Sequence, residues 1–154
     1  MAATYTTFKA LNCCRRRMVD YDVDGSLNVV DLGQPQAGTD KCVPIATHRR
    51  WVAGLFRSVG TGTVDAFNIF ASTNAAGTGS ATTVVAHAIG SAPDAVGDTI
   101  WLECDADQVR EVLAGATHVG VRVDLLTATD ECVVCFEQHE PVFVGADPTA
   151  DNIA

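Results

Sequence analysis

Four aspartates near the N-terminus have the spacing of a calcium-binding loop. Asp20, Asp22 and Asp24 alternate along the chain, Gly25 follows them, and Asp31 occupies the twelfth position of the segment. Alternate carboxylates around a sharp glycine turn allow oxygen ligands to surround one hard cation. The pattern therefore indicates calcium as a cofactor, within a calcium-dependent binding module. In such a module, calcium would raise the melting temperature, and Asp22→Ala would abolish that rise.

The same segment has a second interpretation, an acidic β-hairpin over Met18 to Leu32. Asp-Gly is favoured in tight hairpin turns, and Asp24-Gly25 lies in the middle of this segment. A calcium loop of this type is followed by a helix, but Gly33 and Pro35 would interrupt one here. The hairpin is the interpretation that the residues favour, and under it the chain needs no cofactor.

The six cysteines suggest structural roles more than chemical ones. Cys132 and Cys135 have the C-x-x-C spacing of metal and redox sites. They fall in a predicted strand, however, where positions i and i+3 point to opposite faces. We therefore expect Cys132 in the core and Cys135 on the outward face. Cys13, Cys14 and Cys135 are candidates for a disulfide or a contact with a neighbouring subunit.

No motif predicts a catalytic site. The four histidines are scattered, and the chain has neither a G-x-S-x-G nor a complete phosphate-binding loop. An enzyme would need a site assembled from residues distant in the sequence. We therefore predict a non-enzymatic protein with no catalytic residue.

Size and charge restrict the partners. The chain has 154 residues, of which 47% are hydrophobic, and a net charge of −9. This composition suits a folded domain and disfavours the phosphate backbone of a nucleic acid as the main partner. No apolar run approaches the roughly 20 residues of a membrane span. The N-terminal residues lack the pattern of a signal peptide, so we expect no export by the usual route.

The remaining pattern is a series of short apolar strands separated by Gly, Ser, Thr and Asn. We predict strands over residues 49–59, 63–72, 81–89, 99–104, 118–127, 131–138 and 142–144. One helix is predicted over 105–114: Asp105 begins it, Gln108 completes a capping box, and Val109, Val112 and Leu113 form its buried face. About eight strands without regular βα alternation indicate an all-β fold, an antiparallel β-sandwich or jelly roll with one short connecting helix.

Three regions follow from this reading. Residues 1–48 are an N-terminal arm with the hairpin, residues 49–144 are the sandwich, and residues 145–154 are a polar tail. The strand from Arg49 to Val59 is apolar on both faces, which is typical of a central strand or of one covered by another subunit. Trp51 and Phe56 are therefore candidate interface residues.

Residues 49–138 resemble small structural proteins of tailed bacteriophages. The resemblance rests on the aromatic-led strand RRWVAGLF, the AVGD that precedes WLEC, the short acidic helix, and VGVRV followed by a TDE turn. It implies a β-sandwich virion component that assembles in the host cytoplasm. The expected function is capsid decoration, in which the protein binds itself and neighbouring major capsid subunits as a homo-oligomer. A head–tail connector, neck or tail component is the alternative.

Overall fold

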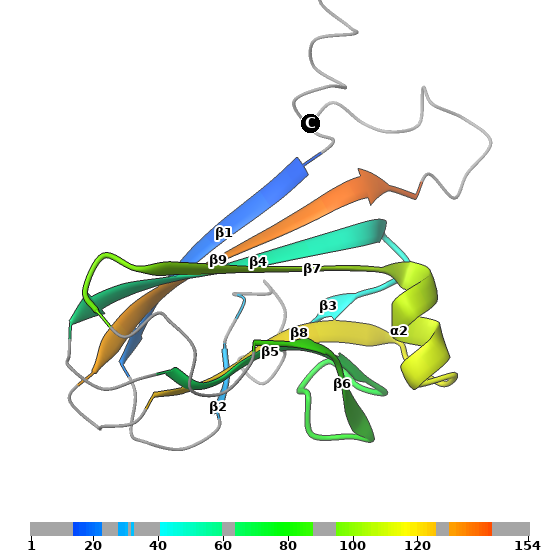
Figure 1. The fold of residues 1–154 in the computed structure, drawn as a ribbon. Helices are drawn as coiled ribbons and strands as arrows, with labels where there is room; N and C mark the ends of the chain where they lie inside the picture. The colour runs from blue at the N-terminus through cyan, green and yellow to red at the C-terminus, as the bar shows by residue number, and fades with distance from the viewer. Residues whose placement is uncertain are drawn as a thin grey trace, which may run out of the picture.

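The protein is a two-layered antiparallel β-sandwich. A computed structural model describes residues 14–22, 28–30, 32, 41–59, 64–87, 95–125 and 130–142. In this part of the chain, two sheets face each other and one short helix lies at an end of the sandwich (Figure 1). The predicted all-β class is confirmed.

The two sheets contain four and five strands. Sheet A consists, in spatial order, of β1 (Cys14–Asp22), β9 (Glu131–Pro141), β4 (His48–Val59) and β7 (Thr99–Asp105). Sheet B consists, in spatial order, of β2 (Asn28–Val29), β8 (His118–Leu125), β5 (Val64–Ser72) and β6 (Ala81–Ala86), with β3 (Val43–Pro44) also paired to β8.

The pairing is nested, as in a jelly roll. The first strand pairs with the last, β1 with β9; the short β2 and β3 pair with β8, β4 pairs with β7, and β5 pairs with β6. Such nesting results when one long antiparallel hairpin is rolled into two sheets, and it is the topology of jelly rolls. Of the two architectures that the sequence left open, the described strands form the jelly roll.

The predicted hairpin over Met18 to Leu32 is wrong. β1 lies in sheet A, whereas β2 lies in sheet B, so the two strands belong to different layers and do not pair with each other. The physical reason is the nested topology, in which β9 and β8, distant in sequence, provide the partners that a local hairpin would have provided.

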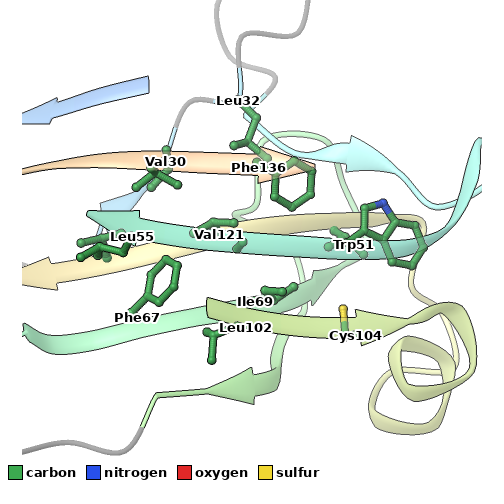
Figure 2. Packing of buried hydrophobic residues seen from close by; sticks show 14 of the residues in the cluster. Val30, Leu32, Trp51, Leu55, Phe67, Ile69, Leu102, Cys104, Val121 and Phe136 are labelled. Atoms are coloured by element: carbon green, nitrogen blue, oxygen red, sulfur yellow. The ribbon is translucent and has the colours of Figure 1, made fainter. Parts of the chain in front are cut away.

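The core lies between the sheets. Trp51, Leu55, Phe67 and Phe136 are fully buried there, and Figure 2 shows them between strands of the two layers. On β4, β7 and β9, the residues of this cluster occupy alternate positions, which is the period of a strand with one inward face.

The helix α2 (Ala106–Val112) has the predicted N-terminus. The Asp105 side chain accepts hydrogen bonds from the N–H groups of Asp107 and Gln108, and the Gln108 side chain accepts one from the Asp105 N–H, which completes the capping box. The predicted buried face needs correction, because Val112 is exposed. The inward residues are Ala106, Val109 and Leu113, at the spacing i, i+3 and i+7.

Two predicted boundaries also differ. β9 runs unbroken to Pro141, and Val142 follows it directly without beginning a separate strand; residues 143–144 lie outside the described residues. The sandwich also begins before residue 49, since β1 pairs along its whole length with β9, and Val30, Leu32, Val43 and Ile45 belong to the core.

Candidate functional site: the outer face of sheet A

The proposed calcium ligands are not arranged as a calcium loop where the structure describes them. Asp20 and Asp22 lie in the extended strand β1, opposite Val133 and Glu131 of β9. Asp24 and Asp31 fall outside the described residues. Strands β1 and β2 flank the segment, in place of the helices of a helix–loop–helix site. In the described part of the chain, no cluster of three or more His, Cys, Asp or Glu side chains could hold a metal ion. Calcium binding stays a prediction.

The C-x-x-C pair is divided between two faces, as the alternation predicts. Cys132 belongs to the core, whereas Cys135 lies outside the core cluster, with its Sγ 3.9 Å from Glu137 Oε1. Cys135 is only 3% exposed, so the expectation that it contacts or bridges a neighbouring subunit is wrong for the folded chain. The side chains of Cys13 and Cys14 lie outside the described residues.

Two core thiols are held in their neutral form. Burial raises the pKa of Cys132 to about 12, partly offset by Arg57. Burial also raises the pKa of Cys104 to about 12, with smaller contributions from Asp105 and Glu103 in the same direction. Because a thiolate is the form that attacks substrates and binds metals, these cysteines act as apolar core residues.

These pKa values predict a loss of stability at alkaline pH. Above pH 9, unfolded thiols lose protons that the folded ones keep, so unfolding becomes more favourable as the pH rises from 9 to about 12. Each thiol should lower the free energy of unfolding by up to about 1.4 kcal/mol per pH unit in this range. Urea titrations at several pH values measure the slope. The double variant Cys104→Ala/Cys132→Ala should show a shallower slope, and an unchanged slope would contradict the assignment.

The outward side chains of sheet A form a face with an apolar half and a charged half. The register places the residues of β7, β4 and β9 in rows across the sheet. The apolar half has two rows. The first row consists of Thr99, Phe56 and Val133, and the second consists of Trp101, Gly54 and Cys135. The charged half also has two rows. The first row consists of Glu103, Val52 and Glu137, and the second consists of Asp105, Arg50 and His139. This face is the candidate functional site.

An aromatic pair dominates the apolar half. Trp101 is 49% exposed, and its ring meets that of Phe56 edge to face, with centroids 5.4 Å apart. The indole lies over Gly54: a Cβ on that glycine would come within 2.6 Å of Trp101 Cζ3. Only glycine allows the ring to lie flat on the sheet at this position. A large exposed aromatic group of this kind is typical of binding surfaces.

The structure corrects one predicted interface residue and adds another. Trp51 is 0% exposed and points into the core, so it offers no surface to a partner. Phe56 does lie on the outward face, half-buried against Trp101. The sequence reasoning missed Trp101. The outward position of Trp101 could have been predicted, because Trp101 alternates with the inward residues Ile100 and Leu102.

The charged half is linked by ion pairs. The Arg50 guanidinium pairs with the Glu103 carboxylate and lies 3.9 Å from that of Glu140. His139 Nε2 lies 3.0 Å from Glu137 Oε2, and Glu137 is largely buried. These pairs hold the charged side chains in defined positions beside the aromatic pair.

Two open depressions lie where this face meets α2. The first, of about 390 Å³, is lined by Arg50, Glu103, Cys104, Asp105, Gln108 and Glu140. The second, of about 570 Å³, shares Asp105 and Glu140 with the first and adds Arg49, Arg110 and His48 among its lining residues. His48 is buried, and its Nδ1 lies 3.2 Å from Gln138 Nε2. Acidic and basic side chains line both depressions, which suits a polar rim of an interface.

A buried ion pair closes the opposite end of sheet A. Arg57 NH2 lies 3.4 Å from Asp130 Oδ2, and both side chains are at most 1% exposed. Arg57 follows the inward residues of β4, and Asp130 directly precedes β9. The pair therefore belongs to the framework that fixes β4 against β9, and not to the outer face.

Comparison with protein-family models and with curated proteins finds no match to this sequence. The described residues include no helix with the length and hydrophobicity that a membrane span requires.

Proposed function

We propose that this chain is a non-enzymatic structural protein of a virus particle, a capsid decoration protein that binds neighbouring capsid subunits through the outer face of sheet A. The exposed Trp101 on this face, packed against Phe56, is the observation that carries the proposal. A rigid aromatic anchor beside charged groups is the usual composition of a protein-binding surface.

The architecture and the sequence pattern support the same assignment. Jelly rolls are common in viral capsid domains, although they also occur in lectins and cupins, so the topology alone does not assign a function. The resemblance of residues 49–138 to virion proteins favours the capsid among these. The proposed partners are further copies of the chain and the major capsid protein.

The position on the particle is tested by counting copies. In purified particles of the virus that encodes the chain, quantitative mass spectrometry should find it at a copy number comparable with that of the major capsid protein. A few copies per particle would instead indicate a connector, neck or tail component. If the chain is absent from purified particles, it is not a virion protein.

The docking face is tested by rebinding to shells that lack the chain. Trp101→Ala should weaken binding roughly 30-fold, which corresponds to the loss of about 2 kcal/mol at a central aromatic residue. Val112→Ala is the matched control, because Val112 is also an exposed apolar residue but lies on α2. Equal binding by both variants would exclude the outer face of sheet A as the docking surface.

A further inference from the structure

Among the described strands, β7 has one hydrogen-bonding edge that no other strand occupies. It is the last strand of sheet A, and β4 is its only partner among the described strands. The Arg57 N–H donates to the Asp98 carbonyl, 3.1 Å away. In an antiparallel ladder, residues that bond to the partner strand alternate with residues that do not. By this alternation, the residues of β7 that bond to β4 are Ile100, Leu102 and Cys104, each an even number of positions after Asp98. The backbone groups of the intervening residues therefore point toward the open edge.

The helix closes one end of this edge. The outward N–H of Asp105 already donates to Gln108 Oε1, at 3.0 Å, within the capping box. The open stretch is therefore Thr99 to Glu103, with Trp101 at its centre. The indole ring leans over Gly54, toward β4, so it does not cover the edge of its own strand.

Two other edge strands, β1 and β6, differ from β7 in ways that discourage pairing. β1 contains three consecutive arginines, Arg15 to Arg17. The ladder of β6 with β5 shifts register between Ile69 and Phe70. Charges and bulges of this kind protect edge strands from further pairing. β7 contains no Lys, Arg or Pro, and its ladder with β4 has no shift of register.

We propose that a second copy of this chain pairs with β7 antiparallel across a two-fold axis at Trp101, which joins two copies of sheet A into one continuous sheet. This inference rests on the proposed function, because it supplies the homo-oligomer that would bind the capsid. In this register Trp101 lies opposite the partner's Trp101, and Thr99 lies opposite the partner's Glu103.

The charges on β7 fit this register. Each Glu103 carboxylate faces a threonine across the axis, so no like charges lie directly opposite each other, which would be unfavourable. The two aromatic pairs, Phe56 with Trp101 in each copy, become neighbours on one outer face. Because each copy uses its single β7 edge, the two-fold pairing closes as a dimer and does not continue into a filament.

Cysteine cross-linking tests the register. Directly opposite residues in such a pair have Cα atoms about 5.5 Å apart, within the range that a disulfide spans. A mixture of the Thr99→Cys and Glu103→Cys variants should form a disulfide-linked dimer under mild oxidation. Each variant alone should form no more than the wild type, because two copies of the same residue would be about 13 Å apart along the strands. Thr99 and Glu103 are exposed, so the fold should be unchanged, and the four described native cysteines are buried; the wild type measures the background from Cys13 and Cys14.

Each outcome is decisive. Cross-linking in the mixture alone, with a dimer mass by light scattering for the wild type, supports the two-fold pairing. Equal cross-linking in the mixture and in the separate variants, or none in any of them, overturns it. If the cross-link fails while the wild type still binds shells, only the pairing is wrong. If the dimer forms but the chain is absent from particles, the proposed function is wrong and the pairing stands.

Discussion

Replacing Trp51 by alanine should lower the free energy of unfolding by about 3–5 kcal/mol, whereas replacing Trp101 by alanine should lower it by about 1 kcal/mol. Trp51 is fully buried between the sheets, so its removal loses apolar burial and leaves a cavity. Trp101 is 49% exposed and packs against Gly54 and the ring of Phe56. Urea denaturation followed by circular dichroism measures both changes.

These two tryptophans are the only ones in the chain, so fluorescence distinguishes their environments. The Trp101→Ala variant retains the buried indole and should emit at shorter wavelength, with weak quenching by acrylamide. Trp51→Phe is the control for a Trp51→Ala protein that fails to fold. It keeps most of the volume, and the Trp51 indole N–H has no hydrogen-bond partner to lose. Equal destabilisation by the two alanine variants would contradict the assignment of Trp51 to the core.

The sequence predicts the fold class because alternation is a local property. The strand from His118 to Leu125 shows this most clearly, with Val119, Val121, Val123 and Leu125 all buried as the period of two requires. The helix start at Asp105 is equally local, since a capping box needs only two residues three positions apart.

The errors come from interactions between distant residues. The segment from Met18 to Leu32 contains a strong hairpin signal at Asp24-Gly25, yet β1 pairs with β9, more than a hundred residues away. Pairing strength depends on the whole sheet, so a local turn signal does not decide between a hairpin and a crossover. The prediction of Trp51 as an interface residue failed for a similar reason. Alternation separates Trp51 from Phe56, but the sequence does not say which face of β4 meets the other sheet.

The outer face of sheet B adds a packing feature that sequence patterns do not reveal. Phe70 is fully buried on that face, beneath the Arg122 guanidinium, which lies 4.0 Å from the ring centroid. Gly120 makes room for this packing, because a Cβ there would come within 2.6 Å of Cys42 Sγ. Alternation places Gly120 and Phe70 outward, where exposure would be the simple expectation.

Replacing Asp130 by alanine should cost about 3–5 kcal/mol, because it removes the carboxylate that lies 3.4 Å from the buried Arg57 guanidinium. Arg57 lies on the inward side of β4, two residues after Leu55, at the place where the β4–β9 ladder shifts register. A charge at this position needs a partner inside the protein, since water does not reach it. The urea-induced unfolding of Asp130→Ala measures the cost.

The double variant Arg57→Met/Asp130→Leu separates the effect of the buried charges on stability from the effect of filling the same positions with side chains. Removing both charges takes away the buried guanidinium together with its carboxylate, so the double variant should be more stable than Asp130→Ala despite carrying one more substitution. Surface pairs offer the matched comparison: Arg50 and Glu103 are about half exposed, and Glu103→Ala should cost less than about 1 kcal/mol. A similarly small cost for Asp130→Ala would mean that Arg57 is satisfied without Asp130. The end of the sandwich would then be held by its backbone ladder and not by this ion pair.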